Sequence, residues 1–257
     1  MNSTFESVPG LTLEACNTNE NPITLADIPE FFLSLLTLNN GDTYLYDKKK
    51  FFSIYFPFSN NIGSVITVNQ YEIKPGDSLN LANFPLVIKA ITGKCHLIVS
   101  GFNKLLIKNN EATSISLLKQ SEIYKVSKPW GHELWLNNNF GSDYYSFKEV
   151  FIKQGFQTSL QYHEKKIECA LLYEGRCKVF FGSLIEEDRQ IAKDSLSFKI
   201  LNPYSKIFIQ PLTTHRMNAL SDMYHYEIST PELDDVIRLS DDTNRGHGRI
   251  HDEHKKI

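Results

Sequence analysis

Residues 155–175 read GFQTSLQYHEKKIECALLYEG and place polar side chains at strand-like spacing among apolar ones. Side chains two positions apart in a strand point to the same face, so Gln161 and His163 can reach one point together. The polar run Glu164-Lys-Lys predicts a hairpin turn. We expect the chain to return antiparallel, so that Glu168 faces the same point from the neighbouring strand.

This spacing predicts a metal site once His215 is added. His215 follows Pro211-Leu-Thr-Thr, and a later strand can bring it opposite the first three side chains. One amide, two imidazoles and one carboxylate suit a divalent ion such as Zn, Fe, Mn or Ni, with room left for water or substrate oxygens. On spacing alone, hydrogen-bonded structural histidines and polar packing of Gln161 remain the alternative.

The rest of the sequence predicts an all-β protein. Short runs of β-branched and aromatic residues are separated by Gly, Pro and Asn clusters, which is typical of a β-sandwich or barrel. The predicted strands cover residues 64–68, 86–91, 96–100, 114–118, 145–152, 170–173, 178–181, 206–209 and 224–229. The exception is Thr24–Leu36, where the helical spacing of apolar residues predicts a short helix that Asn39-Asn-Gly ends.

The chain also repeats a pattern in the same order. Residues 73–80 (IKPGDSLN) are echoed by residues 152–161 (IKQGFQTSLQ), and residues 93–95 (GKC) by residues 175–177 (GRC). A duplication would divide the chain into domains 1–124 and 125–257. Chance similarity between strand-turn-strand units is the alternative reading of the repeat.

Composition narrows the class of protein. The 257 residues carry a net charge of only −3, which gives no reason to expect nucleic acid or an anionic membrane as a partner. No stretch approaches the roughly 20 apolar residues that span a bilayer, and the first ten residues do not read as a signal peptide. Four cysteines without a C-x-x-C pair indicate reduced thiols, so we expect a cytoplasmic protein.

The motifs resemble those of the cupin superfamily, G-x5-H-x-H-x3,4-E-x6-G and G-x5-P-x-G-x2-H-x3-N. More closely, residues 128–249 resemble the cupin domain of type II mannose-6-phosphate isomerases. The resemblance rests on Lys128-Pro-Trp-Gly, Ser159-Leu-Gln-Tyr-His163, Pro211-Leu-Thr-Thr-His-Arg216, residues 227–238 and Gly248-Arg249. It implies a double-stranded β-helix, the jelly-roll barrel, and together with the repeat it implies a bicupin with a degenerate N-terminal half.

The resemblance assigns His163, Glu168 and His215 to one divalent metal ion, with Zn the first choice and Fe, Mn or Ni as alternatives. Gln161 stands where the general motif has its first histidine. The stretch from Pro211 to His215 is one residue shorter than the family's and lacks its glycine. In the first half Asn80 stands near the position of Gln161 without His or Glu ligands after it, so we expect no metal there.

The resemblance further implies aldose-ketose isomerisation of a phosphorylated sugar. Glu227 alternates with apolar neighbours and is the candidate general base, and Arg249 matches the Gly-Arg that ends the isomerase motif. Lys153, Arg216 and Arg238 are further candidates for binding the phosphate. An ion-paired strand carboxylate and ordinary surface cations are the alternatives. We also expect solvent exposure of two segments: the turn that contains Lys165 and Lys166, and the tail after Arg249.

Other functions stay open at this stage. A regulatory cupin could bind a sugar without converting it, and cupins also include epimerases and dioxygenases, because one fold hosts many reactions. Gln161 disfavours an iron dioxygenase, which generally needs more histidine ligands. Cupins often pair edge to edge, so the resemblance also implies a homodimer.

Overall fold

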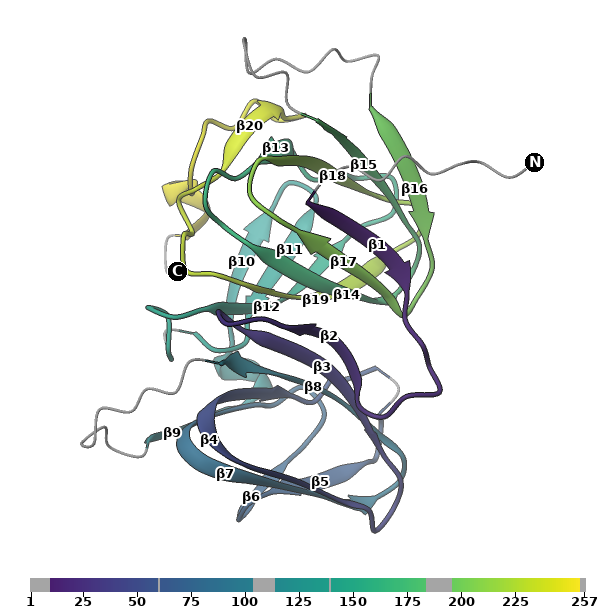
Figure 1. Cartoon of the computed structure of the whole chain (residues 1–257), viewed down its shortest axis with the longest axis vertical. Coiled ribbons are helices and arrows are strands. Elements are labelled where there is room, and N and C mark those ends of the chain that lie inside the picture. Colours follow the sequence, from purple (N-terminus) through teal and green to yellow (C-terminus); the bar gives the residue numbers. More distant parts are fainter. Residues whose placement is uncertain (1–9, 60, 104–113, 139, 184–195, 255–257) are drawn as a thin grey trace. The chain divides into compact units, whose positions relative to one another are not determined.

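The computed structural model describes residues 10–59, 61–103, 114–138, 140–183 and 196–254. Within these ranges the chain forms twenty strands and two short 3₁₀ helices, Gln120–Glu122 and His251–His254 (Figure 1). The all-β prediction is therefore confirmed, and each predicted strand overlaps an observed one. Neither of the helices found in these ranges is long and apolar enough to cross a lipid bilayer.

The chain divides into two compact units. We call residues 17–125 and 134–148 the N-terminal unit, and residues 1–16, 126–133 and 149–257 the C-terminal unit. One boundary between the units falls between residues 125 and 126, while residues 1–16 belong to the C-terminal unit and residues 134–148 to the N-terminal unit. The domains 1–124 and 125–257 remain a prediction. Strand β1 (Leu11–Ala15) lies in the C-terminal unit because it pairs antiparallel with β17 (Ser205–Ile209).

The strands of the C-terminal unit form two sheets. The seven-stranded sheet has the order β1, β17, β14 (Glu168–Glu174), β19 (Met223–Ser229), β12 (Ser146–Ile152), β11 (Gly131–Trp135) and β10 (Tyr124–Lys128), and the unit boundaries fall within the last three strands. The five-stranded sheet has the order β16 (Ser197–Leu201), β15 (Cys177–Ser183), β18 (Thr213–Ala219), β13 (Leu160–Tyr162) and β20 (Ile237–Ser240).

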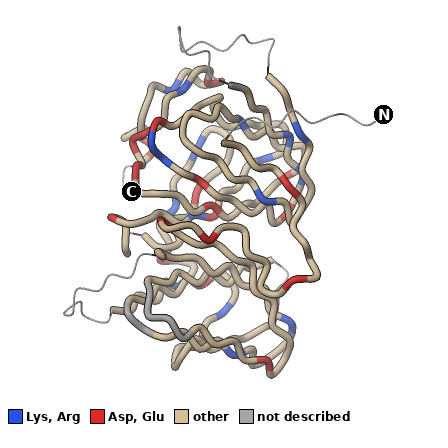
Figure 2. The backbone as a smooth tube through the Cα atoms, in the orientation of Figure 1, with Lys and Arg blue, Asp and Glu red and all other residues tan. Residues whose placement is uncertain are grey.

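Both sheets of the C-terminal unit contribute to one hydrophobic core. Ala170 and Leu172 from β14 pack in the same buried cluster as Val179 from β15 and Met217 from β18. Side chains two positions apart in a strand share a face. Glu168 therefore lies on the same face of β14 as the core residue Ala170, and His215 lies on the same face of β18 as the core residue Met217. Acidic and basic positions are interspersed along this unit and along the other (Figure 2).

The N-terminal unit is built around an eight-stranded sheet with its own core. Its order is β2 (Ile23–Asp27), β3 (Phe32–Leu38), β8 (Cys95–Phe102), β4 (Thr43–Tyr55), β7 (Ser78–Thr92), β5 (Val65–Val68) and β6 (Tyr71–Ile73), while β9 (Ser114–Leu118) pairs with β7. The core cluster includes Leu36, Phe52, Ile54, Leu79 and Leu97 from four of these strands.

The helix predicted for Thr24–Leu36 is wrong. These residues form β2 and β3, an antiparallel pair joined by a turn that contains Pro29. Leu33, Leu35 and Leu36 are all buried because β3 is covered on both faces. An apolar run that is buried on both faces has no two-residue alternation, so periodicity alone cannot distinguish it from a buried helix.

The glycines of the sequence repeat adopt matching conformations. Gly76 and Gly155 have φ of 94° and 81°, and Gly93 and Gly175 have φ of 73° and 81°. All four lie in the left-handed region, where side chains other than glycine are strained. The two copies therefore turn the chain alike at both repeated positions.

We predict that Gly175→Ala destabilises the protein by about 2–4 kcal/mol. The new Cβ would lie 2.2 Å from the backbone oxygen of Asp222, in addition to the strain of the left-handed backbone. Gly155→Ala is the matched control, because φ is the same and no heavy atom lies within 4 Å of its Cβ. It should cost about 1 kcal/mol in urea unfolding. Equal losses for the two variants would contradict the predicted clash.

Candidate metal centre

Three predicted metal ligands meet in the C-terminal unit. His163 directly follows β13, His215 lies in β18, and both strands belong to the five-stranded sheet. Glu168 begins β14 in the seven-stranded sheet. The predicted hairpin is therefore wrong: the chain crosses from one sheet to the other after His163, and Glu168 reaches the common point from the opposite sheet.

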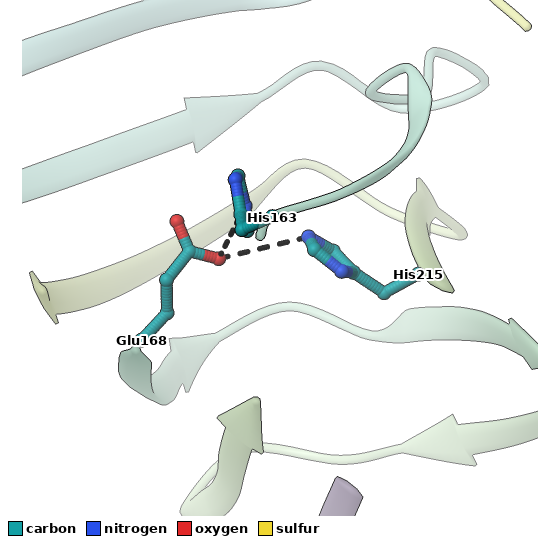
Figure 3. A group of neighbouring side chains, drawn as sticks. All are labelled: His163, Glu168 and His215. Carbon is teal, nitrogen blue, oxygen red and sulfur yellow. Dashed lines mark ion pairs between the residues drawn. The ribbon is translucent and has the colours of Figure 1, made fainter. Parts of the chain in front are cut away.

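The geometry is that of a compact ligand cluster. The Oε2 atom of Glu168 lies 3.4 Å from Nε2 of His163 and 3.6 Å from Nε2 of His215 (Figure 3). One ligand atom from each residue lies within 4.8 Å of the others, and all three side chains are buried. In the described part of the chain this is the one such group of three His, Cys, Asp or Glu residues.

Backbone carbonyls fix the orientation and the tautomer of both imidazoles. Nδ1 of His163 bonds to the carbonyl oxygen of Asp235, and Nδ1 of His215 lies 3.0 Å from the carbonyl oxygen of Thr213. A carbonyl oxygen can only accept, so each neutral ring carries its proton on Nδ1. Both Nε2 lone pairs then face the carboxylate, which is the usual arrangement around a bound metal ion.

These residues fit a divalent cation. Nε2 of His163 is buried and has no hydrogen-bond partner among the described residues. With the tautomers above, two nitrogen lone pairs and one carboxylate oxygen converge with no proton between them. Such a set of acceptors repels itself unless a cation lies among them. Imidazole and carboxylate are ligands that Zn, Mn, Fe and Ni accept.

Lys166 changes the charge of this site. The prediction that it is solvated is wrong, because its side chain is only 5% exposed and its Nζ forms an ion pair with Oε1 of Glu168. Burial alone would raise the pKa of Glu168, but the positive charge of the Lys166 ammonium holds it well below its usual range. The carboxylate is thus ionised, with Oε2 facing the histidines.

Asp235 organises the crossover between the sheets. Its carboxylate accepts the backbone N–H groups of Glu164, Lys165 and Lys166 at 2.9, 2.6 and 2.9 Å, while its carbonyl holds His163. Burial opposes ionisation of Asp235, but the three N–H bonds lower its pKa. Sequence reasoning missed this residue, because no local spacing connects it with a turn about seventy positions earlier.

Comparisons with known proteins agree on the fold. No protein-family model matches the sequence, and no curated protein matches it. Among solved structures, the formate complex of Lactobacillus farciminis oxalate decarboxylase has a TM-score of 0.64 at 12% identity, covering 91% of this chain and 90% of the other. This chain has a cupin fold.

Two other similar structures support the cupin fold. Ylba from E. coli, described by the family model DUF861, has a TM-score of 0.58 at 12% identity, covering 88% of this chain and 86% of its own. A Bacillus subtilis oxalate decarboxylase studied for its Mn(II) centres has a TM-score of 0.59 at 11% identity, covering 82% and 71%. At these identities the likeness shows the fold and no reaction.

Gln161, the fourth predicted ligand of the cupin site, lies beside the triad on the same sheet face. It pairs directly with His215 across β13 and β18, and antiparallel partners share a face. Its Oε1 accepts a hydrogen bond from the Ser159 hydroxyl at 2.6 Å. Ligation by Gln161 remains a prediction, and it would require this oxygen to serve a metal as well.

The predicted general base faces the interior of the barrel. Glu227 pairs with Ala170 and His225 pairs with Leu172, so both side chains share the face of β14 that carries Glu168. His225, which sequence reasoning missed, is buried, and its Nε2 lies 3.9 Å from Oε2 of Glu227. The sequence did contain a signal for His225: it stands two positions before Glu227 in a predicted strand, so the two side chains share a face.

The four predicted phosphate-binding cations lie in different places. Lys153 is exposed in the turn after β12, and Arg249 is exposed with Nε 3.4 Å from Asp234. Arg216 follows His215 on the opposite face of β18 and donates to the carbonyl of Ser240. Substrate binding by these three remains a prediction.

Arg238, the fourth of these cations, lies on β20, the strand next to the one that carries Gln161. It pairs directly with Gln161 across β13 and β20, and its guanidinium bonds to the carbonyls of Gly246 and Gly248. The tail beyond is not simply solvated as predicted, because Glu253 forms an ion pair with Lys128 at 2.9 Å. Substrate binding by Arg238 likewise remains a prediction.

The corresponding part of the N-terminal unit is built differently. Asn80 is fully buried and its Oδ1 accepts from the Ser53 hydroxyl at 2.5 Å, while its amide donates to the carbonyl of Leu136. Ser53 also bonds to the Tyr145 hydroxyl at 2.7 Å. The position matched to Gln161 is thus occupied by a buried hydrogen-bond network.

We predict that Asp235→Ala weakens divalent-metal binding by about 10- to 100-fold. The substitution removes the acceptor for three N–H groups and loosens the crossover that places His163. Asp234→Ala is the matched control, since Asp234 is 72% exposed and contacts Arg249 at the surface. Chelator-competition titrations with Zn and Mn would measure both affinities. An unchanged affinity in Asp235→Ala would show that the carboxylate does not position the ligand.

We also predict a pH dependence of stability in the metal-free protein. Burial is the largest cause and lowers the pKa of His215 from 6.5 to about 4, although the negative charge of Glu168 opposes it. The unfolded chain therefore binds the proton first, and stability should fall by about 3 kcal/mol between pH 6.5 and 4. Carboxylates whose pKa is lowered in the folded protein, such as Asp235 and Glu168, also reduce stability when they are protonated, but mainly below pH 4.

Urea unfolding across this range would measure the slope, with His215→Gln as the control that lacks the titrating ring. A wild-type profile that is flat from pH 6.5 to 4, or the same slope in both proteins, would contradict the assignment to His215.

Proposed function

We propose that the C-terminal unit binds one divalent metal ion and that the protein is a metal-dependent cupin enzyme. The observation that carries this proposal is the convergence of Nε2 of His163, Nε2 of His215 and Oε2 of Glu168, with both Nδ1 atoms held by backbone carbonyls. Three protein ligands, or four with Gln161, leave positions free for substrate oxygens. Zn, Mn, Fe and Ni are all candidates for the ion.

The specific reaction that we propose is aldose-ketose isomerisation of a sugar phosphate. A bound divalent ion would supply polarisation of the substrate's carbonyl and neighbouring hydroxyl. Glu227 is the proposed general base, taking a proton from C2 and returning it to C1. Its place on the Glu168 face of the sheet supports this role, and His225 beside it offers a partner that can hold the carboxylate in position.

Lys166 favours an anionic substrate in the same site. Its ammonium offsets the charge of the Glu168 carboxylate, so this ion pair adds no net charge to the site. A divalent ion added there makes the ligand cluster positive, and phosphate or carboxylate groups are attracted to it. This observation also supports a second candidate, metal-dependent conversion of a small carboxylate such as oxalate.

Metal analysis tests the shared part of both candidates. We predict about one divalent ion per chain after expression in metal-replete medium, and loss of that ion in the double variant His163→Ala, His215→Ala. The double variant His247→Ala, His251→Ala removes two histidines outside the triad and should keep the ion. Wild-type protein free of metal would contradict the proposal.

An assay panel then decides the reaction. Hexose and pentose phosphates test isomerisation, and oxalate tests the second candidate. Glu227→Gln should lower kcat of the isomerase by about 100-fold or more while the metal content stays unchanged, because a general base contributes about 10²–10⁴-fold. Metal occupancy with no turnover on any of these compounds would overturn the enzyme and support a binding cupin.

A further inference from the structure

The N-terminal unit contains a cavity of about 110 Å³ that is separate from the metal centre. Thr24 and Asp27 from β2, Phe32 and Ser34 from β3, and Tyr44 and Tyr46 from β4 contribute to its lining. The other described lining residues, Pro22, Ala26, Leu36 and Val99, are apolar. All of this lining belongs to the N-terminal unit, whereas the triad belongs entirely to the C-terminal unit.

Strand pairing explains why the cavity exists. Thr24 and Ser34 pair across β2 and β3, which places both hydroxyls on one wall. The other wall is the first part of β4, where Tyr44 and Tyr46 pair with β7. Strand β8 pairs with β4 only from Phe51 onward, so the first part of β4 leaves β8 and opens a space.

Three aromatic rings line this space at different angles. The rings of Phe32 and Tyr46 are nearly parallel, with an interplanar angle of 16° and centroids 6.0 Å apart. The ring of Tyr44 is inclined at 51° to that of Tyr46, with centroids 6.4 Å apart. Aromatic faces carry negative electrostatic potential, and several inclined rings around one space attract a cation.

The charge of the lining has one sign. Among the described residues that line the cavity, Asp27 is the only one with a formal charge, and none is Lys, Arg or His. Its Oδ1 accepts from the neutral amide of Asn103 at 2.6 Å, and in the described ranges no cation pairs with it. Phosphate or carboxylate ligands would therefore be repelled, while a cation would meet both the carboxylate and the ring faces.

We propose that this cavity binds a compact organic ammonium ion. The pocket of about 110 Å³ opens to solvent beside the exposed residues Thr24 and Asp27, so it can seat a group such as tetramethylammonium or a choline head without enclosing it. The rings of Phe32, Tyr44 and Tyr46 contact the methyl groups, and Asp27 balances the charge. The hydroxyls of Thr24 and Ser34 offer hydrogen bonds to a polar substituent. This site does not depend on the metal centre or on the proposed function.

Isothermal titration calorimetry of the full chain with four probes tests the proposal. Tetramethylammonium and choline should bind with millimolar affinity or better. The probe 3,3-dimethylbutan-1-ol, a neutral molecule with the shape of choline, should bind at least about tenfold more weakly, because it lacks the charge that the rings attract. Glucose should not bind. Equal affinity for choline and its neutral analogue, or preferential binding of glucose, would overturn the proposal.

Variants assign the binding to the cavity. Asp27→Asn keeps an acceptor for Asn103 and should weaken tetramethylammonium binding about tenfold, as should Tyr44→Leu. Glu72→Gln, which removes an equal charge from an exposed position outside the lining, should bind like wild type. His163→Ala should also bind like wild type. Absence of saturable binding in wild type, or equal weakening by Asp27→Asn and Glu72→Gln, would overturn the assignment.

Discussion

The candidate metal centre depends on two groups of Asp235, its backbone carbonyl and its side-chain carboxylate. Its carbonyl oxygen fixes the ring of His163, and its carboxylate accepts three successive backbone N–H groups of the crossover. Those residues carry the chain from the five-stranded sheet to Glu168 in the seven-stranded sheet. Without this support the crossover would have unsatisfied N–H groups beside a buried charge, which is costly. One residue thus determines both the direction of a ligand, through its backbone carbonyl, and the path of the strand after it, through its side chain.

Part of this site could be predicted from sequence because it depends on short spacings. Two-residue alternation placed Gln161 and His163 on one side of the chain, and the motif placed Glu168 and His215 at the same point. The hairpin was wrong because a polar break shows where a strand ends and not which sheet receives the next one. Sheet assignment is set by distant partners, here β17 and β19 for the strand of Glu168.

Other features lie outside the reach of local pattern. Lys166 reads as a turn lysine, and only the fold shows that its ammonium is buried against Glu168. The strand Phe32–Leu38 was predicted as part of a helix, because burial on both faces removes the alternation that identifies strands. His225 and Asp235 gain their roles from partners elsewhere in the chain, so an inspection of neighbouring residues gives them no special weight.

The pairing of β1 with β17 has a consequence for how the chain can be cut. A fragment that starts at residue 125 would lack the strand that covers the edge of the seven-stranded sheet, and this edge would present unpaired backbone groups to other molecules. The C-terminal unit is therefore discontinuous, and the N-terminal unit is largely an insertion within it. Because β17 is synthesised long after β1, strand β1 can join its sheet only after Ile209 has been added to the chain.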